Sequence, residues 1–475
     1  MAPSRSRAQR TQEELDDQDR ERWDQLFAEE EARHRALSRI DLQANQGESD
    51  DDLASPSPVY DRCLRVYGAD HVLRMCNFAP MEFERLWDAL EDHILSHWNV
   101  GRGKKSSNDP KDILFMLLAS LKHCGSWDTV SNLFHIDPSP FQKMIKKFTT
   151  MLEPFVYQTF VEDEEKRWTM KQLTATGNTF ANFPCARYAT DVTFQQADTP
   201  SGRVNEIKKY FSGKHHLYGL KVEVSVIPTG VAVNCSSWEP GSVHDSTIFR
   251  SNKMFHISAM QKKFDETLLD DEGPLLDQYE HDWAVLVDKE YQGLVDEFRI
   301  IQPKIKAPHE PPLSAEDRRE IDRISQDRVL VENYFGRLKK MWGVMAHKWT
   351  RDRPSYNMFF RTCLAFTNYS VRCRPLRREE GVYFQRYEAR LIDVGLATEE
   401  SKKLKRQKYR DDRRARLQLH SRGVVRTRTS SSRRTSVGNV GLDSDSRHRT
   451  TSNRRASVGS SSLLDSDYSI EFGLS

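Results

Sequence analysis

The spacing of apolar side chains changes once along this chain, and that change constrains the fold more than any other feature. Between about residues 80 and 153, apolar residues recur every three or four positions, as in MEFERLWDALEDHILSHW and SPFQKMIKKFTTMLEP. This spacing predicts helices that bury one face. From about residue 185 the apolar residues alternate with polar ones and β-branched residues become frequent, which predicts strands. We therefore expect an α/β fold with a helical region in front of it.

The strand predictions fall in three places. RYATDVTFQQA, which begins at Arg187, is one strand, and YGLKVEVSVIPTGVAVNCSSW gives two strands joined at Pro228-Thr229-Gly230. A third apolar run, WAVLVD, ends at Asp288, and a long helix is predicted from about Ser314 to Met345. In α/β folds of this kind the chemistry lies near strand ends.

The helical region between residues 59 and 155 has two interpretations. Its last three helices are short and separated by turns, which is typical of a helix-turn-helix domain, and Lys143, Lys146 and Lys147 would then meet DNA phosphates. Many small helical bundles show the same pattern without binding DNA. The sequence leaves both open.

Composition excludes several classes of protein. No run approaches the roughly 20 consecutive apolar residues of a membrane-spanning helix, and the first ten residues lack the apolar core of a secretory signal. Seven cysteines occur without a CxxC pair, which argues against a cysteine zinc site and for a reducing compartment. A soluble, intracellular protein without membrane contact is expected.

The two ends of the chain carry opposite charge. Residues 11–58 hold 15 acidic and 5 basic side chains, and residues 402–475 hold 18 basic and 7 acidic ones. We expect a charged helical or disordered acidic arm over residues 1–58 and a disordered, basic, Ser/Arg-rich tail over 402–475. Such tails are most often simply solvated, but this one also favours nucleic acid as a partner. KKLKRQK, which begins at Lys402, matches a nuclear-import signal.

The middle of the chain is almost neutral, because residues 59–401 have a net charge of only −2. Binding of an anionic substrate must then depend on local patches or on a partner protein. Lys208, Lys209, Lys214 and Arg328 are candidates for phosphate contacts, although each is equally well explained as a solvated surface charge.

Three carboxylates are candidates for a metal site. Phosphodiester cleavage needs divalent ions held by hard oxygen ligands, so a nuclease requires carboxylates that converge on one point. Asp191, Asp288 and Glu332 each come from a different predicted element. The alternatives are a loop carboxylate, a turn residue at a strand end, and a surface helix residue paired with an arginine four positions earlier, respectively. Composition alone cannot choose among 70 acidic residues.

The sequence around these carboxylates is more specific. In order, the chain contains YATDVTF, PGSVHDS, LVDKEYQG and RVLVENYFGRLKKMWG, and residues 80 to 380 as a whole closely resemble the core of PIF/Harbinger-type DDE transposases. By position, Asp191, Asp288 and Glu332 match that family's metal-binding triad, with 96 and 43 residues intervening. Asp245 matches a further acidic position that would order the site or cap a helix. Where the family usually has a small residue, this chain has Glu290.

The resemblance implies several properties. It implies an RNase H-like catalytic domain over residues 185–380, use of Mg²⁺ or Mn²⁺, DNA as substrate, a homo-oligomer, and a separate Myb/SANT-type partner for DNA binding and nuclear entry. The predicted function is a metal-dependent DNA endonuclease or transposase in the nucleus. The alternatives are a domesticated DNA-binding or regulatory protein that has lost the reaction, and a nuclease that acts on RNA.

Overall fold

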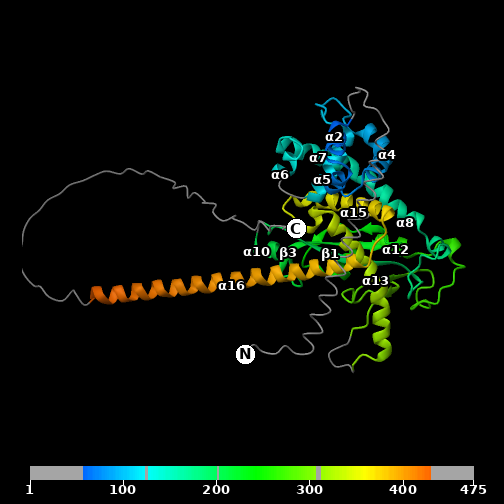
Figure 1. Cartoon of the computed structure of the whole chain (residues 1–475). Helices are drawn as coiled ribbons and strands as arrows, with labels where there is room; N and C mark the ends of the chain where they lie inside the picture. Colours follow the sequence, from blue (N-terminus) through cyan, green and yellow to red (C-terminus); the bar gives the residue numbers. More distant parts are fainter. Residues whose placement is uncertain (1–56, 124–126, 201–202, 306–311, 429–475) are drawn as a thin grey trace, which may run out of the picture. The chain divides into compact units, whose positions relative to one another are not determined.

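A computed structural model describes residues 57–123, 127–200, 203–305 and 312–428 of the chain (Figure 1). Nearly all of the predicted acidic arm, and the tail beyond Arg428, lie outside the described residues. The chain divides into two compact units, Met1–Leu404 and Lys405–Ser475. In the part that the structure describes, no helix combines the length and apolar character needed to cross a bilayer.

Helices make up the first part of the larger unit. Helix α5 is apolar almost all round, and each of its residues from Asp112 to Leu121 is buried, which makes it the centre of this region. Pro154 lies near the end of α7, where its missing N–H precedes a π-helical turn, η1. The elements are α2 (Pro58–Tyr67), α3 (Ala69–Cys76), α4 (Pro80–His97), α5 (Pro110–His123), α6 (Trp127–Asn132), α7 (Pro138–Tyr157), η1 (Gln158–Glu162), α8 (Asp163–Arg167) and α9 (Met170–Ala175).

A mixed sheet follows, and strand β1 lies at its centre. Over the described residues the strand order is β2-β3-β1-β6-β7, with β4 and β5 also paired to β3. β1 is antiparallel to β3 and parallel to β6. The elements here are β1 (Ala186–Gln196), α10 (Val204–Lys208), β2 (Phe211–Ser212), β3 (Leu217–Val226), β4 (Ala232–Cys235), β5 (Glu239–Pro240), α11 (Asp245–Ser251), α12 (Lys253–Met260), η2 (Phe264–Glu266), β6 (Ala284–Leu286) and β7 (Ile300–Ile301).

Local chemistry explains the long helix and the hairpin. Gly230 adopts a φ of 85° in the turn between β3 and β4, a conformation that favours glycine. Ser314 caps α13 by accepting a hydrogen bond from the backbone N–H of Asp317. The C-terminal elements are α13 (Ala315–Met341), α14 (Gly343–Ala346), η3 (Arg353–Ser355), α15 (Tyr356–Cys373) and α16 (Glu379–Arg428). The first part of α13 projects beyond the sheet, whereas its second part packs on β1 (Figure 1).

One hydrophobic core joins the helices and the sheet within the larger unit. It runs continuously from Tyr60 in α2 through β1, β3 and β6 to Leu391 in α16. Helix α15 packs against α7 and β4, and so lies between the two regions (Figure 1). The sheet and its flanking helices confirm the predicted α/β fold class.

The first part of α16 packs closely on this unit. A Cβ added to Gly336 in α13 would lie 1.8 Å from the carbonyl oxygen of Glu380, so only glycine allows the two helices to approach this closely. Arg337 donates to the Glu380 carboxylate and to the carbonyl oxygen of Arg374. His215 Nε2 lies 2.7 Å from the Glu388 carboxylate.

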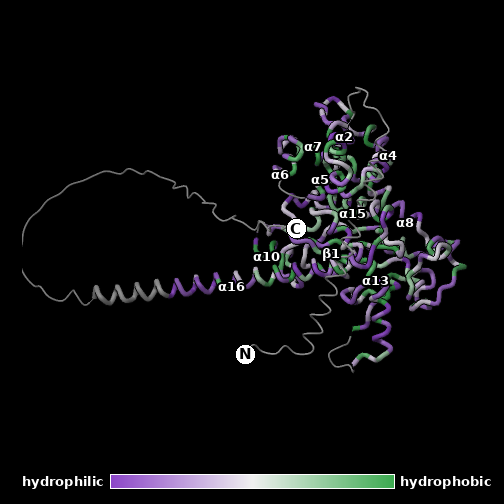
Figure 2. Tube along the Cα trace, in the orientation of Figure 1, coloured by the Kyte–Doolittle hydropathy of each residue, from purple (hydrophilic) through white to green (hydrophobic). Residues whose placement is uncertain are grey.

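Helix α16 differs from the disordered tail predicted from Lys402, because it continues to Arg428. Lysine, arginine, glutamine and leucine are good helix formers, and no proline interrupts this stretch. In the smaller unit, the side chains from Lys405 to Arg414 are all exposed, and the hydropathy colouring shows this part of α16 as hydrophilic (Figure 2).

Candidate active site

Asp191 and Asp288 lie side by side because of the register between β1 and β6. These strands are parallel, and their pairing ends with Ala189 opposite Leu286. Each aspartate lies two residues further along its own strand direction, so equal steps along parallel strands bring both carboxylates to the same place. Asp191 lies inside β1, opposite Val224 of β3, so the alternative of a loop carboxylate is wrong.

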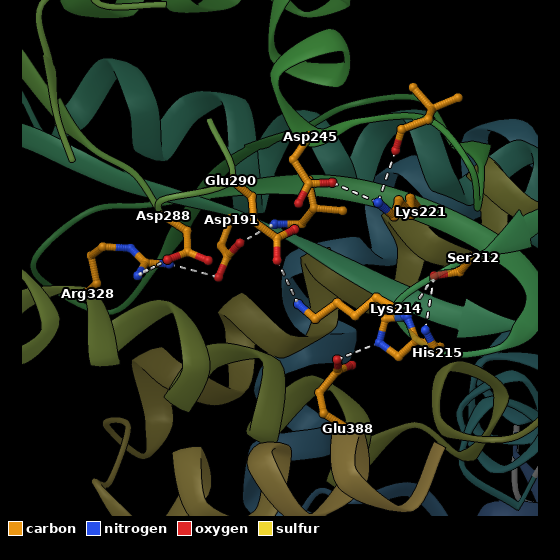
Figure 3. Close-up of polar contacts among 12 residues, drawn as sticks. Asp191, Ser212, Lys214, His215, Lys221, Asp245, Asp288, Glu290, Arg328 and Glu388 are labelled. Carbon is orange, nitrogen blue, oxygen red and sulfur yellow. Dashed lines mark hydrogen bonds and ion pairs between the residues drawn. The ribbon is translucent and has the colours of Figure 1, made fainter. Parts of the chain in front are cut away.

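Arg328, on helix α13, joins these two carboxylates (Figure 3). Its Nη2 donates to Asp191 Oδ2 at 3.0 Å, and its Nη1 donates to Asp288 Oδ1 at 3.2 Å. The Arg328 side chain is 8% exposed, whereas those of Asp191 and Asp288 are 19% and 26% exposed. One buried guanidinium therefore bridges two carboxylates, one in β1 and one just after β6.

Glu332, the third predicted ligand, points elsewhere. It lies one helical turn after Arg328 on α13, and its Oε2 accepts a hydrogen bond of 2.9 Å from Gln385 of α16. Among the described residues, no hydrogen bond or ion pair links Glu332 to either aspartate. Arg328 engages the aspartates instead of pairing with Glu332, which was the alternative derived from the sequence.

Burial sets the electrostatics of Asp191. It raises the pKa of this carboxyl to about 7, even though Arg328 and the backbone N–H of Val192 both favour the charged form. The neighbouring Asp288 adds to the rise. In the folded chain, Asp191 is therefore only partly ionised near neutral pH, unless a cation of higher charge approaches it.

A second group of charges lies next to the aspartates (Figure 3). Asp245 begins α11, and its Oδ1 accepts from Lys221 Nζ at 2.9 Å. Glu290 Oε1 lies 3.5 Å from Lys214 Nζ. Burial, and to a smaller extent Glu290, raise the pKa of Asp245 to about 6 against the opposing effect of Lys221. Asp245 and Glu290 thus lie in one charged cluster with Lys221 and Lys214, beside the aspartate pair.

The two aspartates fit a divalent cation in ligand type. Their hard oxygen atoms are those that Mg²⁺ and Mn²⁺ prefer, and both carboxylates already converge on one cationic group. Throughout the described part of the chain, however, no three Asp, Glu, His or Cys side chains come close enough together to hold a metal ion. A cation at this pair would take the place of the Arg328 guanidinium, and Glu332 would have to leave Gln385 to join it.

The lysine candidates for phosphate contacts are dispersed. Lys146 forms an ion pair of 2.7 Å with Asp352, and Lys147 lies 5.2 Å from the centre of the Trp98 ring. Lys143 of α7 is exposed, as are Lys208 and Lys209 near α10. Lys214 stands beside the site, whereas Arg328 faces its carboxylates and not the solvent.

Comparison with known proteins finds a family to which the middle of the chain is similar. Residues 190–368 match the family described as DDE superfamily endonuclease, and this stretch contains Asp191, Asp288, Arg328 and Glu332. It also contains β6, α13 and the part of β1 that carries Asp191. The central part of this chain is thus similar to DDE superfamily endonucleases.

A curated relative points the same way. The probable transposase for insertion sequence element IS702 from Microchaete diplosiphon is 22% identical over 181 residues, which cover 38% of this chain and 56% of that protein. The chain thus spans about half the length of the curated relative that it matches. No solved structure matches the chain.

Sequence reasoning missed two features of the site. Lys221 was not a candidate, although a lysine and a glutamate two residues apart in the otherwise apolar strand KVEVSV are a signal of buried partners. The bridge by Arg328 could not be foreseen either, because spacing on α13 suggested a pair with Glu332.

Proposed function

We propose that this chain is a metal-dependent DNA endonuclease of transposase descent, with Asp191, Asp288 and Glu332 as its catalytic carboxylates. The observation that carries the proposal is the convergence of Asp191 and Asp288 on one cationic group. This pair lies inside the stretch that is similar to DDE superfamily endonucleases. The central strand, β1, is antiparallel to β3 and parallel to β6, and this mixed pairing supports the proposal of an RNase H-like domain.

The reaction is a displacement at phosphorus. The oxygen of a water molecule attacks the phosphate, the P–O3′ bond breaks, and the strand ends in a 3′-hydroxyl and a 5′-phosphate. In strand joining, that 3′-hydroxyl oxygen then attacks a phosphate of the target DNA, and the target's own P–O3′ bond breaks, which releases a 3′-hydroxyl on the target strand. A bound Mg²⁺ or Mn²⁺ would neutralise the charge that develops on the phosphate oxygens and would favour ionisation of the attacking water.

The chain's own residues have distinct tasks in this proposal. Asp191 and Asp288 would hold the cation at the end of the β1–β6 pairing, and Glu332 of α13, whose carboxylate accepts from Gln385 in this structure, would be the third ligand. Asp245 positions Lys221 and Glu290 beside them. Because the site is largely buried, each charge acts in a lower dielectric than that of water.

DNA recognition and location complete the proposal. The resemblance to Harbinger-type transposases supports a nuclear protein that acts as a homo-oligomer with a Myb/SANT-type partner. The helices α6 and α7, with the exposed Lys143, would contribute DNA contacts as a helix-turn-helix pair. The near-neutral charge of residues 59–401 is consistent with dependence on a partner.

Cleavage of DNA tests the proposal. The purified full chain would be incubated with Mg²⁺ or Mn²⁺ and a plasmid that carries the genomic DNA flanking its coding sequence. We expect metal-dependent nicking or double-strand cleavage near terminal inverted repeats. Asp191→Ala and Asp288→Ala should abolish it, whereas Asp296→Ala, which removes an exposed carboxylate, should not. If cleavage is absent, or survives Asp191→Ala, the proposal fails.

A domesticated DNA-binding protein without nuclease activity is the second candidate. The observation that favours it is the arrangement of Arg328 and Glu332, since the guanidinium fills the space between the aspartates and Glu332 is held by Gln385. This candidate predicts DNA binding that needs no divalent metal, and a biological effect that survives substitution of all three carboxylates. An RNA substrate would be revealed by preferential cleavage of RNA in competition with DNA.

A further inference from the structure

The Arg328 bridge, defined as Arg328 with Asp191 and Asp288, is an unusual use of an arginine. A guanidinium commonly binds one carboxylate through two parallel hydrogen bonds. Here the two terminal nitrogens donate to two different carboxylates, one in β1 and one just after β6, at 3.0 and 3.2 Å. The third donor, Nε, is buried and has no hydrogen-bond partner among the described residues. The guanidinium is thus held mainly by the two charges and leaves one donor unsatisfied.

The bridge and a divalent cation require the same oxygen atoms. Arg328 uses Asp191 Oδ2 and Asp288 Oδ1, while the other oxygen of Asp191, Oδ1, already accepts from the backbone N–H of Val192. A guanidinium and a divalent ion also repel each other at close range. The cation can therefore bind this pair only when Arg328 has moved away.

A phosphate group is the partner that would draw Arg328 away. The guanidinium matches phosphate geometry with several donors at once, so Nε would gain the acceptor that it lacks in the bridge. The other two cationic side chains of the site form ion pairs away from the two aspartates, Lys221 with Asp245 and Lys214 with Glu290. Arg328 is the cation whose release would free both aspartates.

From this arrangement we infer that Arg328 couples metal binding to DNA binding. Without DNA, Arg328 occupies the two aspartates and keeps divalent cations out. When a DNA phosphate reaches the site, Arg328 turns to it, and the vacated carboxylates take the cation. Because coupling is reciprocal, the cation must also tighten the binding of DNA by the same factor. Arg328 is then a positioning residue that confines metal loading to the DNA complex. This inference rests on the proposed function.

Binding of Mn²⁺, measured by electron paramagnetic resonance of the free ion, tests the coupling without recourse to cleavage. The full chain would be compared with Arg328→Gln, with and without a 30-base-pair duplex taken from its flanking DNA. Arg319→Gln is the matched control, because it removes the same charge from an exposed position of the same helix. Asp191→Asn removes one of the two carboxylates, so the Mn²⁺ binding that this variant loses is the binding at the aspartates.

We expect Arg328→Gln to bind Mn²⁺ at least tenfold more tightly than the wild type in the absence of DNA. DNA should raise the Mn²⁺ affinity of the wild type and of Arg319→Gln at least tenfold, but should leave that of Arg328→Gln unchanged within twofold. Equal Mn²⁺ affinity of Arg328→Gln and wild type without DNA would overturn the inference. An equal rise in Mn²⁺ affinity on adding DNA to Arg328→Gln and to the wild type would also overturn it.

Two further measurements keep the result interpretable. If Arg328→Gln does not fold, as judged by circular dichroism, Arg328→Lys replaces it; a lysine offers one donor nitrogen in place of the two that hold the aspartates, so the Mn²⁺ affinity of this variant without DNA should also rise. Lower affinity in a folded Arg328→Lys would refute the coupling. Should Asp191→Asn leave Mn²⁺ binding in the DNA complex intact, the proposed function fails. If Mn²⁺ binding requires Asp191 but has the same affinity in Arg328→Gln as in the wild type, only the coupling is refuted.

Discussion

Replacing Asp191 with asparagine should stabilise the protein at alkaline pH and not at acidic pH. Burial raises the pKa of this carboxyl from 3.8 to about 7, a rise of about three units. At about 1.4 kcal/mol per unit, ionising Asp191 in the folded state costs at most roughly 4 kcal/mol. This value already includes the favourable effect of Arg328. The asparagine side chain of this variant would retain an amide oxygen to accept from the backbone N–H of Val192.

The sign of the pH dependence follows from proton linkage. Between pH 3.8 and about 7 the folded wild type holds a proton on Asp191 that the unfolded chain has lost, so its free energy of unfolding falls as pH rises. Above pH 7 this contribution is constant. Asp191→Asn removes the effect, so its advantage over the wild type grows between pH 5 and pH 8. Since the side chain is 19% exposed, we expect a growth of about 2 kcal/mol and not the full value.

Urea unfolding in the presence of EDTA, followed by tryptophan fluorescence at pH 5, 6, 7 and 8, measures this difference. Asp296→Asn removes an equal charge from an exposed position and serves as control, with the same pH dependence as the wild type expected. The reasoning is refuted if the difference between Asp191→Asn and wild type stays constant over this range, or shrinks toward pH 8.

Three other predictions concern the surroundings of the site. Burial lowers the pKa of the Lys339 ammonium group to about 7. Between pH 7 and pH 10 the unfolded chain therefore carries a proton on Lys339 that the folded chain has lost, so the free energy of unfolding of the wild type rises with pH. The stability advantage of Lys339→Met in urea unfolding should decline over that range. Gly336→Ala should lower the thermal midpoint by several degrees in scanning calorimetry and loosen α16, because its Cβ would collide with the Glu380 carbonyl; an unchanged midpoint would contradict the close contact. Glu223→Ala should cost about 3 kcal/mol in urea unfolding, since His256 loses its 2.9 Å partner inside the core, and a cost below about 1 kcal/mol would argue against this pair.

The elements of the fold could be predicted because their signals are local. Alternating β-branched residues predicted β1, and the turn at Pro228-Thr229-Gly230 does separate β3 from β4. The long helix predicted from about Ser314 begins at Ala315 with Ser314 as its cap. The disordered tail was predicted because its composition cannot form a hydrophobic core. A helix rich in lysine, arginine and leucine can form without such a core, and α16 extends to Arg428.

The candidate site was predictable in its residues but not in its geometry. The sequence placed Asp191 and Asp288 on separate strands, whereas their contact depends on the register of Ala189 with Leu286, which local patterns do not encode. The Arg328 side chain could pair with Glu332, four residues away on the same helix, or with two partly buried aspartates that are distant in sequence. That choice is made by burial and charge in the folded chain, so helical spacing gave the wrong partner.

An anomalous diffraction experiment tests the central claim most directly. Crystals of the full chain with its flanking-DNA duplex, grown with Mn²⁺, would be measured near the manganese absorption edge. We predict an anomalous peak between the carboxylates of Asp191 and Asp288, with Arg328 turned away from both and onto a DNA phosphate. A manganese peak elsewhere only, with Arg328 still bridging the two aspartates in the DNA complex, would contradict the claim that these carboxylates form the catalytic metal site.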